Sequence, residues 1–161
     1  MTDDTTEFER VGELISKARF AFVTTTGADG RLLSRPLAIQ DRDFDGDLYF
    51  FTMDPSSKTE EIAADSHVNV SLQSGDDYLS VAGTASVSRD QALIDELWNK
   101  YAEAWFEQGR QDPSVALLKV HAESAEYWTM DDPKPIALIK YAKAIISGDQ
   151  PDVATNRTVE L

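Results

Sequence analysis

The fold of this chain is predicted most directly from one stretch, Leu48-Tyr49-Phe50-Phe51-Thr52-Met53-Asp54-Pro55-Ser56-Ser57-Lys58-Thr59-Glu60. Its first six residues are mostly apolar and aromatic, which is typical of a β-strand. Ser57 and Glu60 have the spacing of a capping box, which predicts that a helix begins at Ser57. The stretch therefore indicates a strand, a polar turn and a helix N-terminus in succession.

The polar turn has the composition of an anion site. A helix N-terminus presents unpaired N–H groups and the positive end of the helix dipole. This turn adds two serine hydroxyls and the Lys58 ammonium, which together suit a phosphate. A plain helix cap with a solvated lysine is the alternative, and taken alone it is the more common arrangement. The rest of the chain has to decide between the two.

The totals of the sequence predict one domain over residues 1–161, with a core at 6–147 and a polar, weakly ordered C-terminal tail at 148–161. The start Met1-Thr2-Asp3-Asp4 is acidic, and no apolar run reaches transmembrane length, so we expect a cytoplasmic protein. The chain has no cysteine, which excludes a thiolate nucleophile and a cysteine-based metal site.

The formal net charge of −14 argues against two classes of partner. A general nucleic-acid binder needs a basic face, and an anionic membrane repels an acidic surface. An acidic protein that binds an anion must gather its few cations in one place. This requirement draws attention to Arg35 and Lys58.

Apolar periodicity and turn residues predict the elements. We expect helices over Thr6–Arg19, Lys58–Ala64, Arg89–Phe106 and Ile136–Ser147. We expect strands over Phe20–Thr26, Leu32–Gln40, Leu48–Met53, Val68–Gln73, Tyr78–Ser88, Val115–His121 and Ala125–Met130. Thr6 and Glu9 form a second capping box, Gly83 suggests a bulge, and the last helix is expected to pack on the barrel, with a strand as the alternative. Hairpins without a βαβ pattern indicate an α+β domain built on an antiparallel barrel.

The usual catalytic motifs are missing from the sequence. No glycine-rich dinucleotide or triphosphate loop and no nucleophile elbow occurs. His67 and His121 are not at metal-ligand spacing, so we interpret both as structural and expect no metal site. No acid–base pair can be assigned, and any redox chemistry would therefore come from a cofactor.

Three further residues are candidates for a ligand site. Arg35 lies in a strand one hairpin before the Ser57-Lys58 turn, so neighbouring strands could bring both cations together, although strand arginines are usually solvated. Thr52 ends its strand beside the turn. Trp98 is expected to pack in the core, whereas Trp105 lies nearer a predicted helix end and could cover an aromatic ligand.

The segments Arg35-Pro36, Asp45-Gly46-Asp47-Leu48-Tyr49-Phe50-Phe51-Thr52 and Ser57-Lys58 resemble the pyridoxamine 5′-phosphate oxidase-like FMN-binding split-barrel superfamily, and within it the general stress protein 26-like branch. The order and spacing of further short segments support the resemblance. These are Tyr78-Leu79-Ser80-Val81-Ala82-Gly83-Thr84-Ala85, Glu96-Leu97-Trp98-Asn99, Ala104-Trp105-Phe106, Asp112-Pro113, Ala125-Glu126-Tyr127-Trp128, Gly148, Asn156 and Leu161.

The resemblance implies a six-stranded antiparallel split β-barrel with flanking helices, and a homodimer with FMN in clefts between the subunits. FAD is a possible substitute for FMN. The family pattern places the cofactor contacts on Arg35, Phe51, Thr52, Ser57 and Lys58, and Trp105 is our candidate for covering the flavin ring.

Two departures from the family pattern limit what the resemblance implies. The true oxidases have a basic pair where this chain has Ser57-Lys58, and a lysine where it has Gln40. Fewer cations predict weaker FMN binding, and no match to the oxidases' substrate residues supports pyridoxamine phosphate oxidation. We expect a flavin-dependent oxidoreductase of unknown substrate. The alternatives are a non-catalytic flavin-buffering protein, or a split barrel with deazaflavin or heme, which the few cations and the placement of the histidines disfavour.

Overall fold

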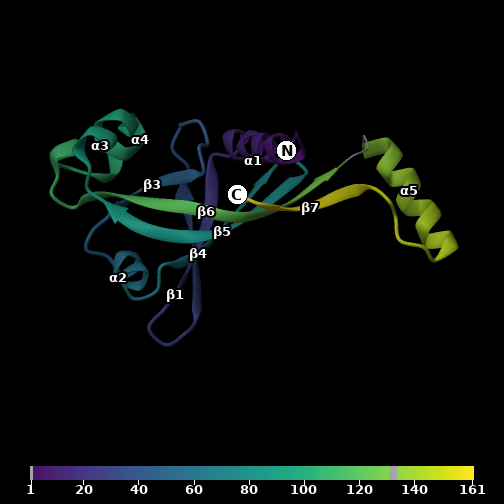
Figure 1. The fold of residues 1–161 in the computed structure, drawn as a ribbon, viewed down its shortest axis with the longest axis horizontal. Helices are drawn as coiled ribbons and strands as arrows, with labels where there is room; N and C mark the ends of the chain where they lie inside the picture. The colour runs from purple at the N-terminus through teal and green to yellow at the C-terminus, as the bar shows by residue number, and fades with distance from the viewer. Residues whose placement is uncertain (1, 131–133) are drawn as a thin grey trace.

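One antiparallel sheet organises the molecule. The computed structural model describes residues 2–130 and 134–161, and its strands follow the order β2-β1-β4-β5-β6-β3, with β7 also paired to β6. The strands are β1 (Phe20–Thr26), β2 (Leu32–Ala38), β3 (Asp47–Met53), β4 (His67–Ser74), β5 (Asp77–Ser88), β6 (Val115–Met130) and β7 (Ala154–Glu160). The sheet curls into a half-barrel (Figure 1), which confirms the predicted α+β split-barrel class.

Five α-helices flank the sheet in the described ranges. They are α1 (Thr2–Lys17), α2 (Ser57–Ala64), α3 (Gln91–Leu97), α4 (Lys100–Trp105) and α5 (Lys134–Ser147). The predicted start of the first helix at the Thr6 capping box is wrong, because α1 already includes Thr2. No helix within these ranges is long and apolar enough to cross a membrane.

The strand β6 is the longest element of the sheet. Its first half pairs with β3, its second half pairs with β7, and β5 runs beside most of its length. The prediction of two strands over residues 115–121 and 125–130 is therefore wrong. The predicted bulge at Gly83 is confirmed, because the β5–β6 register shifts between Ala82 and Gly83.

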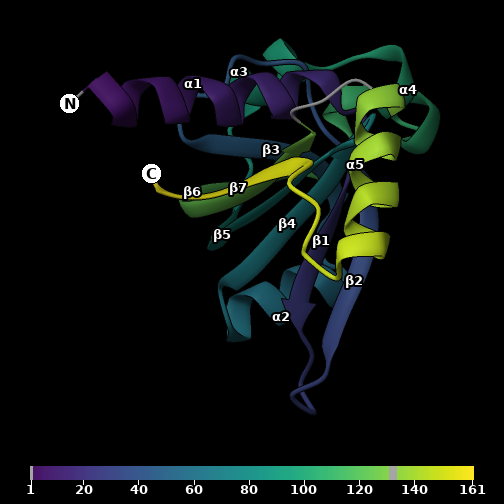
Figure 2. The same ribbon diagram turned by 90° about the vertical axis from the view of Figure 1, so that its right-hand side faces the viewer.

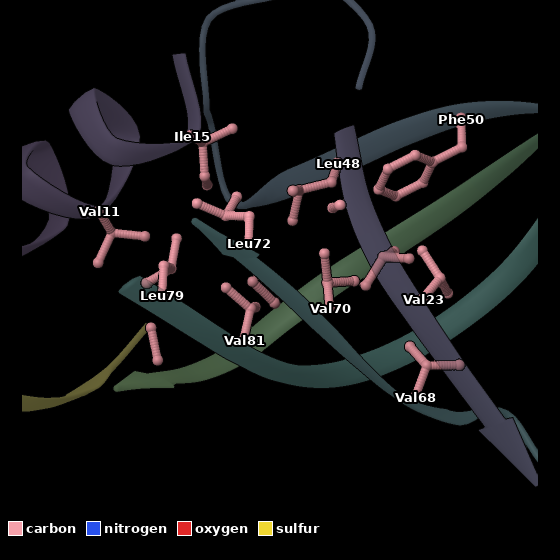
Figure 3. Close-up of a cluster of buried hydrophobic side chains, with 14 of the residues drawn as sticks. Val11, Ile15, Val23, Leu48, Phe50, Val68, Val70, Leu72, Leu79 and Val81 are labelled. Atoms are coloured by element: carbon pink, nitrogen blue, oxygen red, sulfur yellow. The ribbon is translucent and has the colours of Figure 1, made fainter. Parts of the chain in front are cut away.

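The strand β3 is apolar on both faces because it separates two clusters of buried side chains. Leu48 and Phe50 belong to the main core, and Tyr49 and Phe51 belong to the second cluster under α3 and α4. In the main core, α1 covers the sheet, and Val11 lies close to side chains of β4 and β5 (Figure 3). Because β3 is packed on both of its faces, it holds the turn that follows it in a fixed position.

The predicted helix over Arg89–Phe106 is two helices. Trp98 leaves the helical region with φ −60° and ψ 134°, and the side chain of Asn99 caps α4 by accepting from the N–H groups of Tyr101 and Ala102. Asparagine is a strong N-cap residue. The cap at Asn99 therefore explains the break, which the continuous apolar stripe of the sequence did not indicate.

The C-terminal region differs from expectation in two ways. The residues from 148 were expected to be weakly ordered, but β7 pairs with β6 over seven residues. The helix α5 is confirmed as a helix, but its expected packing on the barrel is wrong, because Ile145 and Ile146 are 82% and 87% exposed. Figure 1 shows α5 standing away from the curled sheet.

Candidate functional site

The polar turn joins β3 to α2 and has a defined cap. Ser56 is the N-cap, since its Oγ accepts from the Thr59 N–H at 3.3 Å and its own N–H donates to Thr59 Oγ1 at 2.9 Å. The predicted helix start at Ser57 is confirmed, but the capping residue is Ser56, because Thr59 takes the role expected for Glu60. In the described structure, this cap leaves the N–H groups of Ser57 and Lys58 unpaired at the start of α2.

Lys58 is half-buried beside the end of β3. Its Nζ donates to Oγ1 of the buried Thr52 at 3.1 Å, and no carboxylate of the described residues lies within 4 Å of it. Burial lowers the pKa of Lys58, the nearby Arg35 charge lowers it further, and Glu61 offsets only part of this change. The turn therefore holds an ammonium with a neutral partner and two free N–H groups.

Arg35 belongs to the same cluster but has its own counter-ion. Its Nη2 donates to both carboxylate oxygens of Glu61 at 2.9 Å, and its Nη1 donates to Thr25 Oγ1 at 2.9 Å. Thr25 in turn donates to Glu61 at 2.6 Å. The predicted placement of two cations near each other is thus found, but of these two only Lys58 lacks an ion-pair partner among the described residues.

A second arginine holds the turn in position. Arg89 donates from Nη2 to the Asp54 carboxylate at 2.6 Å and to the Asp54 carbonyl at 3.0 Å, and from Nη1 to the Pro113 carbonyl at 2.7 Å. The hydrogen bonds from Arg89 are the main reason that the pKa of Asp54 is lowered. This arginine therefore ties the beginning of the turn, where the Asp54–Pro55 peptide is cis, to the loop before β6.

The two predicted aromatic contacts lie in different surroundings. The Phe51 ring packs edge-on against Trp98 at 5.5 Å, so only its backbone is available to a ligand near the turn. Trp105 is 77% exposed at the end of α4. In both views α4 and α2 lie on opposite sides of the sheet (Figures 1 and 2), so Trp105 and Lys58 do not share a site within one copy.

Three residues around the site were not predicted. Thr25 and Glu61 hold Arg35, and the spacing of Glu61 three residues after Lys58 on one helix face was the available signal. Gln40, which replaces the oxidases' lysine, is buried and accepts from Asn99 Nδ2 at 2.8 Å. Gln40 thus anchors the start of α4 to the sheet.

This donor set fits one phosphate group. Lys58 supplies a charge, Ser57 an exposed hydroxyl, and the first turn of α2 supplies unpaired N–H groups, which together suit acceptor-only oxygens. Among the described residues there is no cluster of three histidine or acidic side chains that could hold a metal ion.

The chain is similar to proteins of one known family. The model of a family described as pyridoxamine 5′-phosphate oxidase like matches residues 6–152. The chain is 32% identical over 129 residues to protein bli-3 of Neurospora crassa, and this match covers 73% of the chain but only 62% of bli-3.

Two solved structures are similar over most of their length. A protein assigned as a general stress protein 26 from Jannaschia sp. CCS1 is 29% identical, with a TM-score of 0.76 and full coverage of both chains. The general stress FMN/FAD binding protein from Xanthomonas citri is 27% identical, with a TM-score of 0.70 over 80% of this chain and 92% of that one.

Proposed function

Because the chain belongs to the pyridoxamine 5′-phosphate oxidase-like family, we propose that it is an FMN-binding protein of the general stress type, working in the cytoplasm as a flavin-dependent oxidoreductase. The FMN/FAD-binding relative from Xanthomonas citri supports the choice of cofactor. One phosphate-binding cation favours FMN, whose single phosphate it matches, over FAD.

The main support for the proposal is that the half-buried Lys58 ammonium has no counter-ion among the described residues. A half-buried ammonium costs free energy unless an anion compensates it, yet its hydrogen-bond partner is the neutral Thr52. A phosphate at the start of α2 would supply the missing charge. Without a ligand, the burial of this ammonium therefore lowers the free energy of unfolding of the protein.

Each residue of the cluster would have a distinct part in holding the cofactor. Lys58, Ser57 and the first turn of α2 would bind the phosphate, while Thr52 orients the ammonium. Arg35, fixed by Glu61, would add positive potential beside them, and the backbone near Phe51 would contact the ribityl chain or ring edge. Bound flavin would supply hydride or electron transfer, and the protein would supply position and electrostatics.

We also propose that the protein is a homodimer with the cofactor cleft between subunits. Trp105 is exposed and lies across the sheet from Lys58 in one copy, so a second copy is needed if this ring is to cover the flavin. Phe20 and Phe22 on the outer face of β1 are more than half exposed and would be covered by the same association.

The Lys58→Gln variant tests the phosphate site. Losing a charge-assisted hydrogen bond costs about 1.5–3 kcal/mol, so FMN should bind about 10- to 150-fold more weakly in a fluorescence titration. Riboflavin, which lacks the phosphate, should bind equally to both forms. The variant should unfold at the same or a higher temperature without ligand, because it removes a desolvated charge.

The matched control is Lys17→Gln, which removes an exposed lysine at the end of α1 and should leave both affinities unchanged. Equal weakening of FMN and riboflavin by Lys58→Gln would contradict the role given to Lys58. Failure of the wild-type protein to bind FMN would refute the proposed function. Anaerobic mixing with NADH or NADPH then separates the two flavin roles, since a flavin-buffering protein would leave bound FMN oxidised.

A further inference from the structure

A second polar depression lies between α1 and the end of the sheet. It has a volume of about 300 Å³, and α1, β6 and β7 form its walls. Tyr127 faces Arg157 and Thr129 faces Thr155 across the β6–β7 pair, so their side chains lie on one side of the sheet. Figures 1 and 2 show this region well separated from α2, so the depression is distinct from the Lys58 site.

Thr129 is a buried polar group with no hydrogen-bond partner for its hydroxyl among the described residues. Its side chain lines the depression and the residue is only 9% exposed. In the described part of the chain its hydroxyl has no hydrogen-bond partner. Buried hydroxyls are nearly always paired, because leaving one unpaired costs free energy. A molecule in the depression is the available partner.

Arg157 supplies a cation at the same place. No carboxylate of the described residues lies within 4 Å of it. Arg10 lines the α1 side, where Glu13 at 3.0 Å and Asp77 at 3.7 Å already engage it. Arg157 is therefore the free guanidinium of this depression.

The remaining wall favours an acceptor as ligand. The Tyr127 hydroxyl donates to the Glu7 carboxylate, and burial, followed by Glu7, raises the pKa of Tyr127 to about 12. The phenol therefore stays protonated at neutral pH, and the carboxylate that could attract a cation is already hydrogen-bonded. A guanidinium and hydroxyl donors match the oxygens of an oxyanion.

We propose that this depression binds a small oxyanion, a carboxylate or a phosphate ester, through Arg157 and the hydroxyl of Thr129. The volume is at the lower end for ligand pockets, which suits a small metabolite better than a nucleotide. The site lies within one copy of the chain and does not depend on flavin.

The test is calorimetric titration of the full chain with inorganic phosphate and, separately, with succinate, each against sodium chloride at equal ionic strength. Arg157→Gln should weaken binding about tenfold or more, as expected for a charge-assisted pair. Thr129→Val should weaken it about two- to tenfold, as expected for a neutral hydrogen bond. Thr129→Val should not lower the melting temperature of the free protein, because it removes an unsatisfied hydroxyl.

Two controls separate this site from other cations. Arg31→Gln removes an arginine whose side chain is 82% exposed and should leave the titration unchanged. Lys58→Gln removes the proposed flavin phosphate site, so binding that persists in this variant and is lost when Arg157→Gln is added belongs to the depression. Binding of phosphate alone or of succinate alone would identify the ligand class. Binding of neither beyond the salt control, or binding in the Lys58→Gln background that Arg157→Gln leaves unchanged, would overturn the proposal.

Discussion

At the residue scale, the two cations of the proposed flavin site have different surroundings. Arg35 is ion-paired with Glu61 and hydrogen-bonded to Thr25, whereas the Lys58 ammonium has only the neutral Thr52 as a hydrogen-bond partner. The sequence could predict that both cations lie near the turn, because strand order brings them together. The sequence could not predict which of the two cations pairs with Glu61, because this depends on where the Glu61 side chain points.

The ion pair of Glu61 predicts a pH-dependent stability. Burial alone would raise the pKa of Glu61, but the hydrogen bonds from Thr25 and Arg35 lower it below the usual value. A depressed pKa means that the carboxylate stabilises the fold above the unfolded-state pKa of about 4.3 and loses this effect as pH falls through the folded value.

Glu61→Gln should therefore cost about 1.5–3 kcal/mol in urea unfolding at pH 7, as expected for hydrogen bonds to a charged group. The difference from wild type should shrink below about pH 4. Glu9→Gln, at an exposed position of α1, is the control and should show no such trend. A difference that stays constant from pH 7 to pH 3 would show that the Glu61 charge contributes nothing.

At the element scale, local sequence signals predict strands better than junctions. The bounds of β1 agree with the prediction at both ends, because aromatic and β-branched residues stop at a glycine turn. The break at Asn99 was missed because Leu97 and Trp98 continue the apolar stripe across it. The continuity of β6 was missed because polar residues near Ser124 interrupt the pattern, while backbone pairing with β5 and β7 continues.

The bulge in β5 gives a test at this scale. A Cβ on Gly83 would lie 2.1 Å from the carbonyl oxygen of His121, a backbone atom that cannot move freely. Gly83→Ala should therefore destabilise the fold by about 1–3 kcal/mol or more.

The matched substitution is Gly12→Ala in α1, where the new Cβ would meet Phe44 at an ordinary 3.5 Å. It should stabilise the protein by about 0.5–1 kcal/mol, because alanine suits a helix interior better than glycine. Thermal and urea unfolding measure both changes. Similar effects from the two substitutions would mean that the bulge is not a constraint.

At the scale of the whole molecule, α5 has its apolar side on the outside. Ala137 is buried, and Lys140 donates to the Asp152 carbonyl at 2.8 Å. The face of α5 that contacts the rest of the protein therefore carries a small residue and a polar residue. The exposed side carries Leu138, Ile139, Tyr141, Ile145 and Ile146. Amphipathic helices of globular proteins show the reverse arrangement, which supports a partner surface in the proposed dimer. Sequence periodicity predicted the helix but not the direction that its apolar side faces.

Ile145→Ser and Ile146→Ser should weaken that dimer. Burying an isoleucine contributes about 1.5–3 kcal/mol, so each change should raise the dimer dissociation constant about tenfold or more in sedimentation equilibrium. Lys143→Gln, on the same helix, should change it little. A wild-type chain that sediments as a monomer at all concentrations would rule out the dimer, and variants that associate like wild type would remove α5 from the interface.

The pairing of β6 also has a consequence for the order of events during synthesis. Both β3 and β7 hydrogen-bond only to β6 in the described sheet. On the ribosome, β3 and the turn after it emerge long before Val115, which pairs with Met53. The nascent chain therefore exposes an aromatic strand with no neighbour until β6 follows. The proposed flavin site is thus among the last parts to acquire its shape, and synthesis that stalls before residue 115 would leave β3 open to aggregation.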